Sequence, residues 1–171
     1  MASFVLTVIG DDRPGLVSEL SAPIKAHGAS WERSQLSHLG GKFAGIVLVT
    51  VPAKELDALI AELMALGDQG LHVVVERTDE PVERESVRFS LELLGADHPG
   101  IVADISAALA ARGVSIEELT TEVREAPMAG GTIFEARAVL VAPPTVDAEE
   151  LRPALEALAH QLMVDIELSA D

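Results

Sequence analysis

The chain repeats itself once, and this repeat limits the possible folds more than any other feature of its 171 residues. The segment from Gly10 to Val17 (GDDRPGLV) recurs 85 residues later as Gly95 to Val102 (GADHPGIV). Thirteen of the 32 positions from Phe4 to Gln35 are identical at that single offset. Internal similarity at one fixed offset indicates a repeated structural unit, so we expect two copies of one fold.

The second half of each copy aligns at a larger offset of 91, which pairs Phe43 with Phe134 and Leu71 with Leu162. The six additional residues fall within residues 125–131 (EAPMAGG), a stretch that is rich in turn-forming residues. Insertions are tolerated best in surface loops, so this stretch is predicted to be a longer loop of the second copy.

The two copies are separated by a short polar segment (TDEPVERES) that is typical of a linker. We therefore predict a first domain over residues 1–78, a linker over 79–86 and a second domain over 87–171. The formal net charge of -16 is divided unequally, because residues 85–171 carry -11 and residues 1–84 carry -5.

The spacing of apolar residues predicts the first elements of each copy. The run from Phe4 to Ile9 is apolar, is rich in β-branched residues and stops at a glycine, which predicts a strand. Pro14 is suited to the first turn of a helix, because proline lacks the N–H that has no partner there. Apolar residues then recur at helical spacing from Leu16 to Ile24, and Gly28 is expected to end the helix.

The remaining elements complete a β-α-β-β-α-β order, which is the ferredoxin-like pattern of an α+β fold. Such a unit has one antiparallel sheet with both helices on one face. Its other face needs cover from the other unit or from a second chain, and we expect a homodimer. The predicted elements of the first copy are a strand over 29–39, a turn at Gly40–Gly41, a strand over 43–51, a helix over 56–63 ended by Gly67, and a strand over 71–75.

Composition excludes several classes of function. The chain has no cysteine, so it has no disulfide, thiolate metal site or cysteine nucleophile. Aromatic residues make up 3 %, and 12 basic residues stand against 28 acidic ones, which argues against direct nucleic-acid binding. The apolar runs are too short for a membrane helix and the N-terminus does not resemble a signal peptide, so we expect a cytoplasmic protein. The histidine spacing predicts no metal site, and no motif predicts a cofactor or an enzyme.

The loop after the first strand of each copy carries the resemblance to a known family. GDDRPGL and GADHPGI, followed downstream by GASW and GVSI, resemble the signature of ACT domains, which are small amino-acid-sensing regulatory modules. The resemblance covers nearly the whole chain, twice. As a whole the chain resembles the glycine cleavage system transcriptional repressor group, whose members consist of two tandem ACT domains without an attached enzyme.

A helix that begins after this loop presents free backbone N–H groups and a partial positive charge, which suit a carboxylate. An aspartate nearby could accept a hydrogen bond from a ligand ammonium group. The resemblance implies that the ligand-binding residues are Asp11, Asp12, Arg13, Gly15 and Leu16 in the first copy and Asp97, His98, Gly100 and Ile101 in the second.

Two structural interpretations compete with this binding hypothesis. Asp12 and Asp97, the one acid that both loops share, could be helix N-caps, which is the common role of an aspartate just before a helix. Gly15 and Gly100 could serve only a close approach of strand and helix.

The sequence thus predicts a non-enzymatic regulatory protein that binds a small amino acid, such as glycine, through ACT domains. Any effect on transcription is expected to pass through a protein partner, because the acidic chain shows no DNA-binding motif. A transcription regulator with a basic surface is the expected partner. The alternatives are a structural or interaction module without a ligand and a regulatory subunit of an amino-acid metabolic enzyme.

Overall fold

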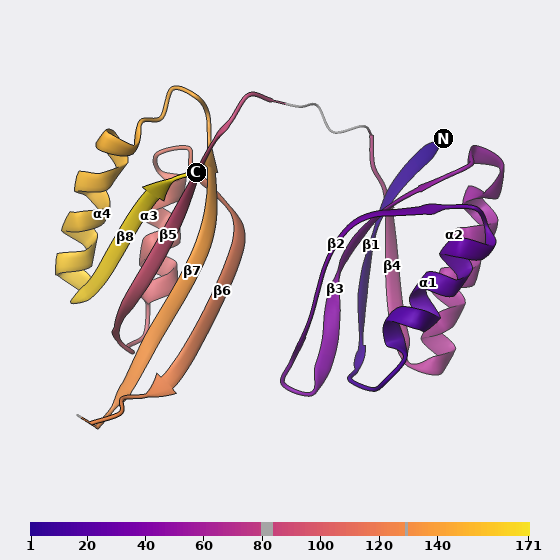
Figure 1. Ribbon diagram of the computed structural model, residues 1–171, viewed down its shortest axis with the longest axis horizontal. Coiled ribbons are helices and arrows are strands. Elements are labelled where there is room, and N and C mark those ends of the chain that lie inside the picture. The colour runs from indigo at the N-terminus through magenta and orange to yellow at the C-terminus, as the bar shows by residue number, and fades with distance from the viewer. Residues whose placement is uncertain (80–83, 129) are drawn as a thin grey trace. The chain divides into compact units, whose positions relative to one another are not determined.

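The computed structural model describes residues 1–79, 84–128 and 130–171. Contacts within the chain define two compact units, Met1–Val82 and Glu83–Asp171, which we call unit 1 and unit 2. Of the predicted linker, residues 80–83 lie outside the described residues. In each unit one sheet is covered by two helices on a single face (Figure 1).

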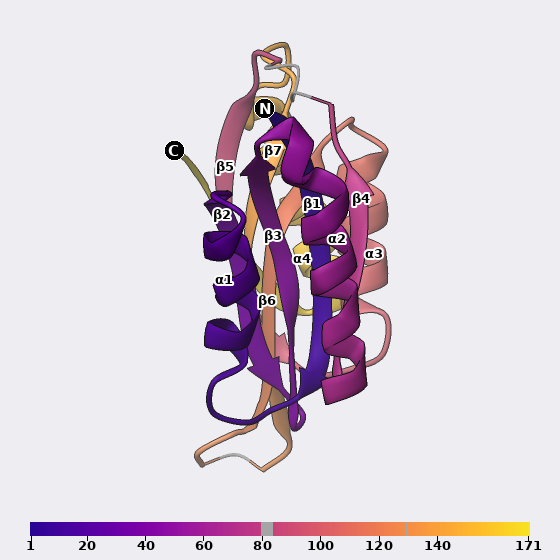
Figure 2. The same cartoon turned by 90° about the vertical axis from the view of Figure 1, so that its right-hand side faces the viewer.

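Both units have the predicted β-α-β-β-α-β order and ferredoxin-like topology. Each sheet is antiparallel throughout, with strand order β2-β3-β1-β4 in unit 1 and β6-β7-β5-β8 in unit 2. Figure 2 shows α1 and α2 lying in front of the sheet of unit 1. Unit 1 comprises β1 (Ala2–Asp11), α1 (Leu16–Ala26), β2 (Ser30–Leu39), β3 (Lys42–Val51), the 3-10 helix η1 (Ala53–Glu55), α2 (Leu56–Ala65), the 3-10 helix η2 (Leu66–Gln69) and β4 (Leu71–Arg77). Unit 2 comprises β5 (Val87–Ala96), α3 (Ile101–Ala110), β6 (Ser115–Glu125), β7 (Thr132–Ala142), α4 (Ala148–Leu162) and β8 (Val164–Ala170).

The core of unit 1 lies between the sheet and its helices. Along β1 the side chains of Phe4, Leu6 and Val8 are fully buried, and the residues between them point to the opposite face, as the two-residue period of a strand requires. Leu20 of α1 and Leu59 of α2 are likewise fully buried. Each helix thus contributes one apolar stripe to a core made of aliphatic side chains and Phe4.

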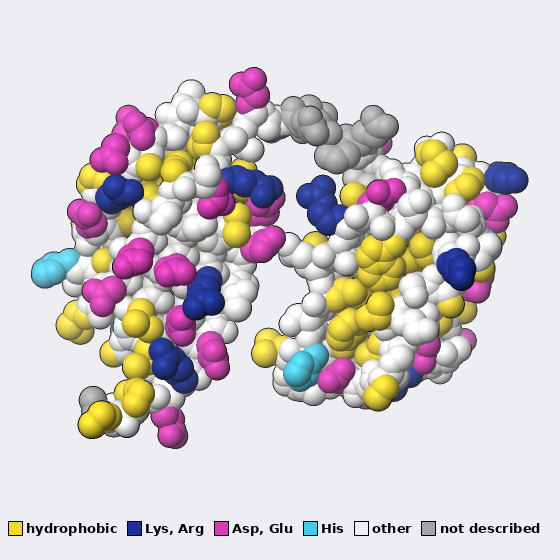
Figure 3. All heavy atoms as spheres, in the orientation of Figure 1, with side chains coloured by type: hydrophobic (Ala, Val, Ile, Leu, Met, Phe, Trp, Pro, Cys, Tyr) yellow, Lys and Arg dark blue, Asp and Glu magenta, His cyan; other side chains and the backbone are white. Residues whose placement is uncertain are grey.

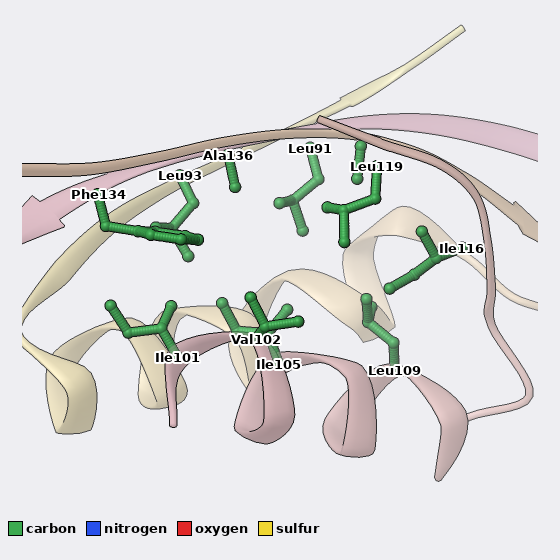
Figure 4. Close-up of a pocket in the computed structure, with 11 residues that line it drawn as sticks. Leu91, Leu93, Ile101, Val102, Ile105, Leu109, Ile116, Leu119, Phe134 and Ala136 are labelled. Carbon is green, nitrogen blue, oxygen red and sulfur yellow. The ribbon is translucent and has the colours of Figure 1, made fainter. Parts of the chain in front are cut away.

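The core of unit 2 has the same plan but retains a small cavity of about 20 Å³ between the sheet and α3. Only apolar residues line it, and they converge from both layers in Figure 4. Ile116 and Ala138, which line the cavity, occupy the positions that Trp31 and Val47 hold in unit 1. Trp31 packs against the core of unit 1. The cavity therefore follows from smaller side chains at equivalent sites.

Two predicted element ends are wrong. Gly67 does not end the second helix, because a 3-10 turn carries the chain to Gln69 and the left-handed residue is Gly70, with φ 86°. In the last strand Gly10 pairs with Leu71 and Gly95 pairs with Val164, so the true offset there is 93. Leu162, which the sequence alignment placed in that strand, is the last residue of α4.

The β2–β3 turn is as predicted, since Gly40 and Gly41 both have positive φ, at 59° and 78°. Such values suit the two-residue hairpin loops that match the strand twist. Of the helices within the described ranges, none is long and apolar enough to cross a lipid bilayer.

Filling the unit 2 cavity should stabilise the protein. We expect Ala138→Val to raise the free energy of unfolding by about 0.5–1 kcal/mol, since the added methyl groups enter apolar space that is now empty. The matched control Val47→Ala, which opens the equivalent space in unit 1, should lower it by about 2 kcal/mol. Calorimetric unfolding of the full chain measures both. A lower melting temperature for Ala138→Val would contradict this account of the cavity.

Candidate functional site

The β1–α1 loop of unit 1 and the β5–α3 loop of unit 2 have the same anchor. The N–H of Asp12 donates to the carbonyl of Gly41 at 3.0 Å, and the N–H of Asp97 donates to the carbonyl of Thr132 at 2.9 Å. Gly41 and Thr132 are equivalent positions at the hairpin between the second and third strands. Each loop is therefore held in place by its own hairpin, beyond the end of the first strand.

A left-handed glycine precedes the first helix of each unit. Gly15 has φ 93° and Gly100 has φ 97°, values that side chains other than glycine rarely adopt. These glycines are the N-cap residues, so α1 begins at Leu16. Pro14, which was predicted in the first helical turn, instead lies in the turn before the helix.

Neither structural interpretation of the loop residues agrees with this geometry. Asp12 and Asp97 are not N-caps, because Gly15 and Gly100 take that position and no side chain caps either helix. The glycines do not serve a close approach either: a Cβ on Gly15 would meet nothing within 4 Å, and one on Gly100 only a side-chain oxygen of Asp104 at 3.7 Å. Glycine is needed here for its backbone conformation, and the space beside it is open.

The first turns of α1 and α3 therefore present backbone N–H groups without a side-chain cap. The side chains of Leu16 and Ile101 point the other way, into the two cores, where they are 4 % and 2 % exposed. Of these two predicted ligand residues, only the backbone N–H is available to a ligand. The partial positive charge of the helix ends favours an anionic group at this position.

In unit 1, Arg13 is held by a carboxylate and a carbonyl. Its guanidinium donates two hydrogen bonds to Glu19, at 2.6 and 2.8 Å, and one to the carbonyl of Gln69 at 3.3 Å. The hydrogen bond raises the pKa of Arg13 and lowers that of Glu19. Arg13 is thus already paired, and its charge is neutralised by Glu19 beside the helix end.

In unit 2, His98 takes the place of Arg13 and makes the equivalent contact. Its Nε2 lies 2.9 Å from the carbonyl of Leu162, which corresponds to Gln69, and its Nδ1 lies 3.1 Å from the carbonyl of Pro99. Because both carbonyls accept a hydrogen bond and a neutral imidazole has a single N–H, the protonated ring is favoured. These contacts raise the pKa of His98 above its ordinary value of 6.5.

Asp11 distinguishes the two loops. In unit 1, Lys42 is the cross-strand partner of Asp11, and its ammonium group donates a hydrogen bond to the Asp11 carboxylate. This hydrogen bond is the main cause of the lowered pKa of Asp11, and the charge of Lys42 adds to it. In unit 2 the equivalent position is Ala96, so the second loop has one acidic residue fewer. Asp12 and Asp97 are both solvent-exposed, and a carboxylate oxygen of Asp12 lies 4.0 Å from His38 Nε2.

Sequence reasoning missed Lys42, Glu19 and the carbonyl of Gln69 as parts of the first loop's surroundings. Lys42 is distant in sequence, and the six-residue separation of Arg13 and Glu19 is not a helical spacing, so no local pattern marks either contact. Within the described ranges, no three His, Asp or Glu side chains are gathered in a way that would hold a metal ion.

Two matches to family models cover most of the chain. Residues 2–76 match one ACT domain model, and residues 89–160 match a second ACT domain model. Together with the βαββαβ topology and the loop in each unit, these matches place the chain in the ACT domain family as a protein of two tandem ACT domains.

Three relatives match the chain over nearly its whole length. The glycine cleavage system transcriptional repressor of Escherichia coli (strain K12) is 26 % identical over 162 residues, which span 92 % of this chain and 84 % of the relative. A crystal structure of an unknown protein from Galdieria sulphuraria is 34 % identical, with a TM-score of 0.88, and the match covers 99 % of this chain and 98 % of that one. A third structure, assigned provisionally to a glycine cleavage system transcriptional repressor, is 19 % identical with a TM-score of 0.76, covers 99 % and 97 % of the two chains, and supports the fold alone.

The raised pKa of His98 predicts a loss of stability at high pH. The contribution of protonated His98 is fully present below pH 6.5, the ordinary pKa, and is lost as the pH rises through the higher folded-state pKa. We expect His98→Arg, which copies unit 1, to reduce the fall in melting temperature between about pH 6 and about pH 8.5.

His98→Gln is the matched control for this experiment. It should melt below the wild type at about pH 6 and approach it at about pH 8.5, because its amide carries no charge at either pH. An equal fall in melting temperature for all three proteins would show that His98 contributes nothing to the pH dependence.

Proposed function

We propose that this protein is a non-enzymatic regulatory sensor that binds a small free amino acid at its β1–α1 and β5–α3 loops. The observation that carries the proposal is the uncapped first turn of α1 and α3, each preceded by a left-handed glycine beside open space. A ligand carboxylate accepts from the backbone N–H groups of that turn, and the ammonium group donates to Asp12 or Asp97. Membership of the ACT domain family supports this ligand class.

Glycine or another small amino acid is the proposed ligand, on the likeness to the Escherichia coli glycine cleavage system transcriptional repressor. The ligand acts by binding one arrangement of the protein more tightly than another, so its effect is limited by that difference in affinity. The two loops differ at Arg13 and His98 and at Asp11 and Ala96, and we expect them to differ in affinity.

The regulatory signal passes through a protein partner. Direct contact with DNA is disfavoured, because a net charge of -16 repels phosphates. Residues 85–171 carry most of this charge, so a transcription regulator with a basic surface is the proposed partner and unit 2 is the proposed place of contact.

A thermal-shift screen of the twenty amino acids tests the ligand. At ten times its Kd, a ligand adds about 1.4 kcal/mol to the free energy of unfolding, which raises the melting temperature of a domain of this size by several degrees. If no amino acid raises the melting temperature at millimolar concentrations, the sensor proposal is wrong and the interaction module without a ligand is favoured.

Glycine substitutions locate the binding loops in the same assay. Gly15→Ala and Gly100→Ala place a methyl group in the space beside the helix end, and each should abolish the shift of its own loop. The matched controls are Gly28→Ala and Gly113→Ala, which impose similar positive-φ strain, at 64° and 72°, beyond the other end of each helix. They should lower stability and keep the ligand response; a full response in the double variant Gly15→Ala, Gly100→Ala would show that the loops do not bind.

A further inference from the structure

The sheet face of unit 1 that lies opposite its helices has an apolar group of residues at its centre, around Thr7. Its central residues alternate with the buried residues of β1 and β3, so they point away from the core. Ile9, Ile46 and Val74 are 48 %, 49 % and 59 % exposed. We call the following set the apolar face: Val5 and Ile9 of β1, Ala44, Ile46 and Leu48 of β3, and Val74 of β4. On the sides of the two units that Figure 3 shows, hydrophobic side chains gather on unit 1 and charged side chains are more numerous on unit 2.

The fold itself does not require an apolar surface here, because unit 2 carries charges on the same face. The strand registers place Arg137 where unit 1 has Ile46, and Glu167 where it has Val74. Arg137 lies 3.4 Å from Glu135 and 3.9 Å from Glu92, so this face is a solvated network of charges. The apolar face of unit 1 therefore calls for a partner surface rather than for water.

Two opposite charges flank the apolar face, one on each edge strand, at the same level along the strands. Arg33 on the edge strand β2 lies beside Leu48, and Glu76 on the other edge strand, β4, lies beside Val5, which is the cross-strand partner of Leu48. Both side chains are exposed, and neither has an ion-pair partner among the described parts of the chain.

We propose that the apolar face of unit 1 is the interface of a two-fold homodimer, with the dimer axis parallel to the strands. A two-fold rotation about that axis places β2 of one copy over β4 of the other. Because the axis is parallel to the strands, residues that are cross-strand neighbours in one sheet face the same set of residues in the other copy. Arg33 of each copy then meets Glu76 of the other, twice, around an apolar centre. Sheets that pack face to face keep their strands nearly aligned, which agrees with this axis.

The area of the whole outer face of the sheet, of which the apolar face is the centre, suits a weak, specific dimer. Three strands of ten residues and one of seven form the sheet. At about 3.3 Å per residue and about 4.8 Å between strands, each copy contributes about 600 Å². The total of about 1,200 Å² is at the lower end of specific interfaces, so the dimer should dissociate on dilution. The proposal concerns a face distinct from the ligand loops and holds for the ligand-free protein, so it does not rest on amino-acid sensing.

The molecular mass of the ligand-free full chain, measured by sedimentation equilibrium across concentrations, tests the interface. We expect a dimer at tens of micromolar that dissociates on dilution. The double variant Ile46→Arg, Val74→Glu should be monomeric throughout and should fold, because unit 2 has these residues at the equivalent positions. The control Met64→Glu makes a similar change on exposed α2 and should leave the dimer intact. A monomeric wild type, or a dimer that survives the double variant, would overturn the proposal.

Exchange of the rim charges tests the orientation. Arg33→Glu and Glu76→Arg should each weaken the dimer by roughly tenfold, because each creates two like-charge contacts. The double exchange Arg33→Glu, Glu76→Arg should restore the wild-type dissociation constant, since the opposite charges meet again. These variants change only exposed side chains and leave the apolar face intact, so they test the interface separately from the apolar substitutions. If the single exchanges weaken the dimer and the double exchange does not restore it, the proposed axis is wrong.

Discussion

One-sided burial governs both units of this protein. Two helices cover only one face of a four-stranded sheet, so every strand places alternate residues in the core and the others on the surface. In β1 this alternation buries Phe4, Leu6 and Val8 and leaves the residues between them for another purpose. The core requires apolar residues on one face of each strand, whereas the residues on the opposite face are free to differ between the two units. Unit 1 uses that freedom for an apolar face, and unit 2 uses it for charges around Arg137.

The loops that precede α1 and α3 depend on a backbone constraint of a different kind. A left-handed residue before the helix turns the chain from the end of a strand onto the covered face of the sheet, and only glycine adopts that conformation without strain. Glycine has no side chain that could cap the helix, so the N–H groups of the first turn face solvent. The residue that allows the crossover therefore also leaves the helix end without a side-chain cap, while Leu16 and Ile101 keep the turn anchored in the core.

The topology followed from the sequence because repeats, apolar periodicity and glycines are local signals. Because of the repeat, the elements predicted for one unit could be assigned to the other, and the Gly40–Gly41 pair predicted the hairpin turn between β2 and β3. Contacts between distant segments carried no such signal. The carbonyls that hold Arg13 and His98 belong to residues just before the last strand, where the alignment offset was wrong by two residues. The helix start was misplaced because proline is common both in a first helical turn and in the turn that precedes it. The apolar face required the strand register, which joins residues from three strands.

The asymmetric cores have a spectroscopic consequence. Trp31 is the single tryptophan of a chain without tyrosine, and it packs against the core of unit 1. Unit 2 has Ile116 at that site and contains no comparable fluorophore. Indole emission therefore reports the folding of one ACT domain only, whereas peptide-bond circular dichroism reports both. The difference between the two signals during denaturation measures the stability of each half of an intact, unlabelled chain.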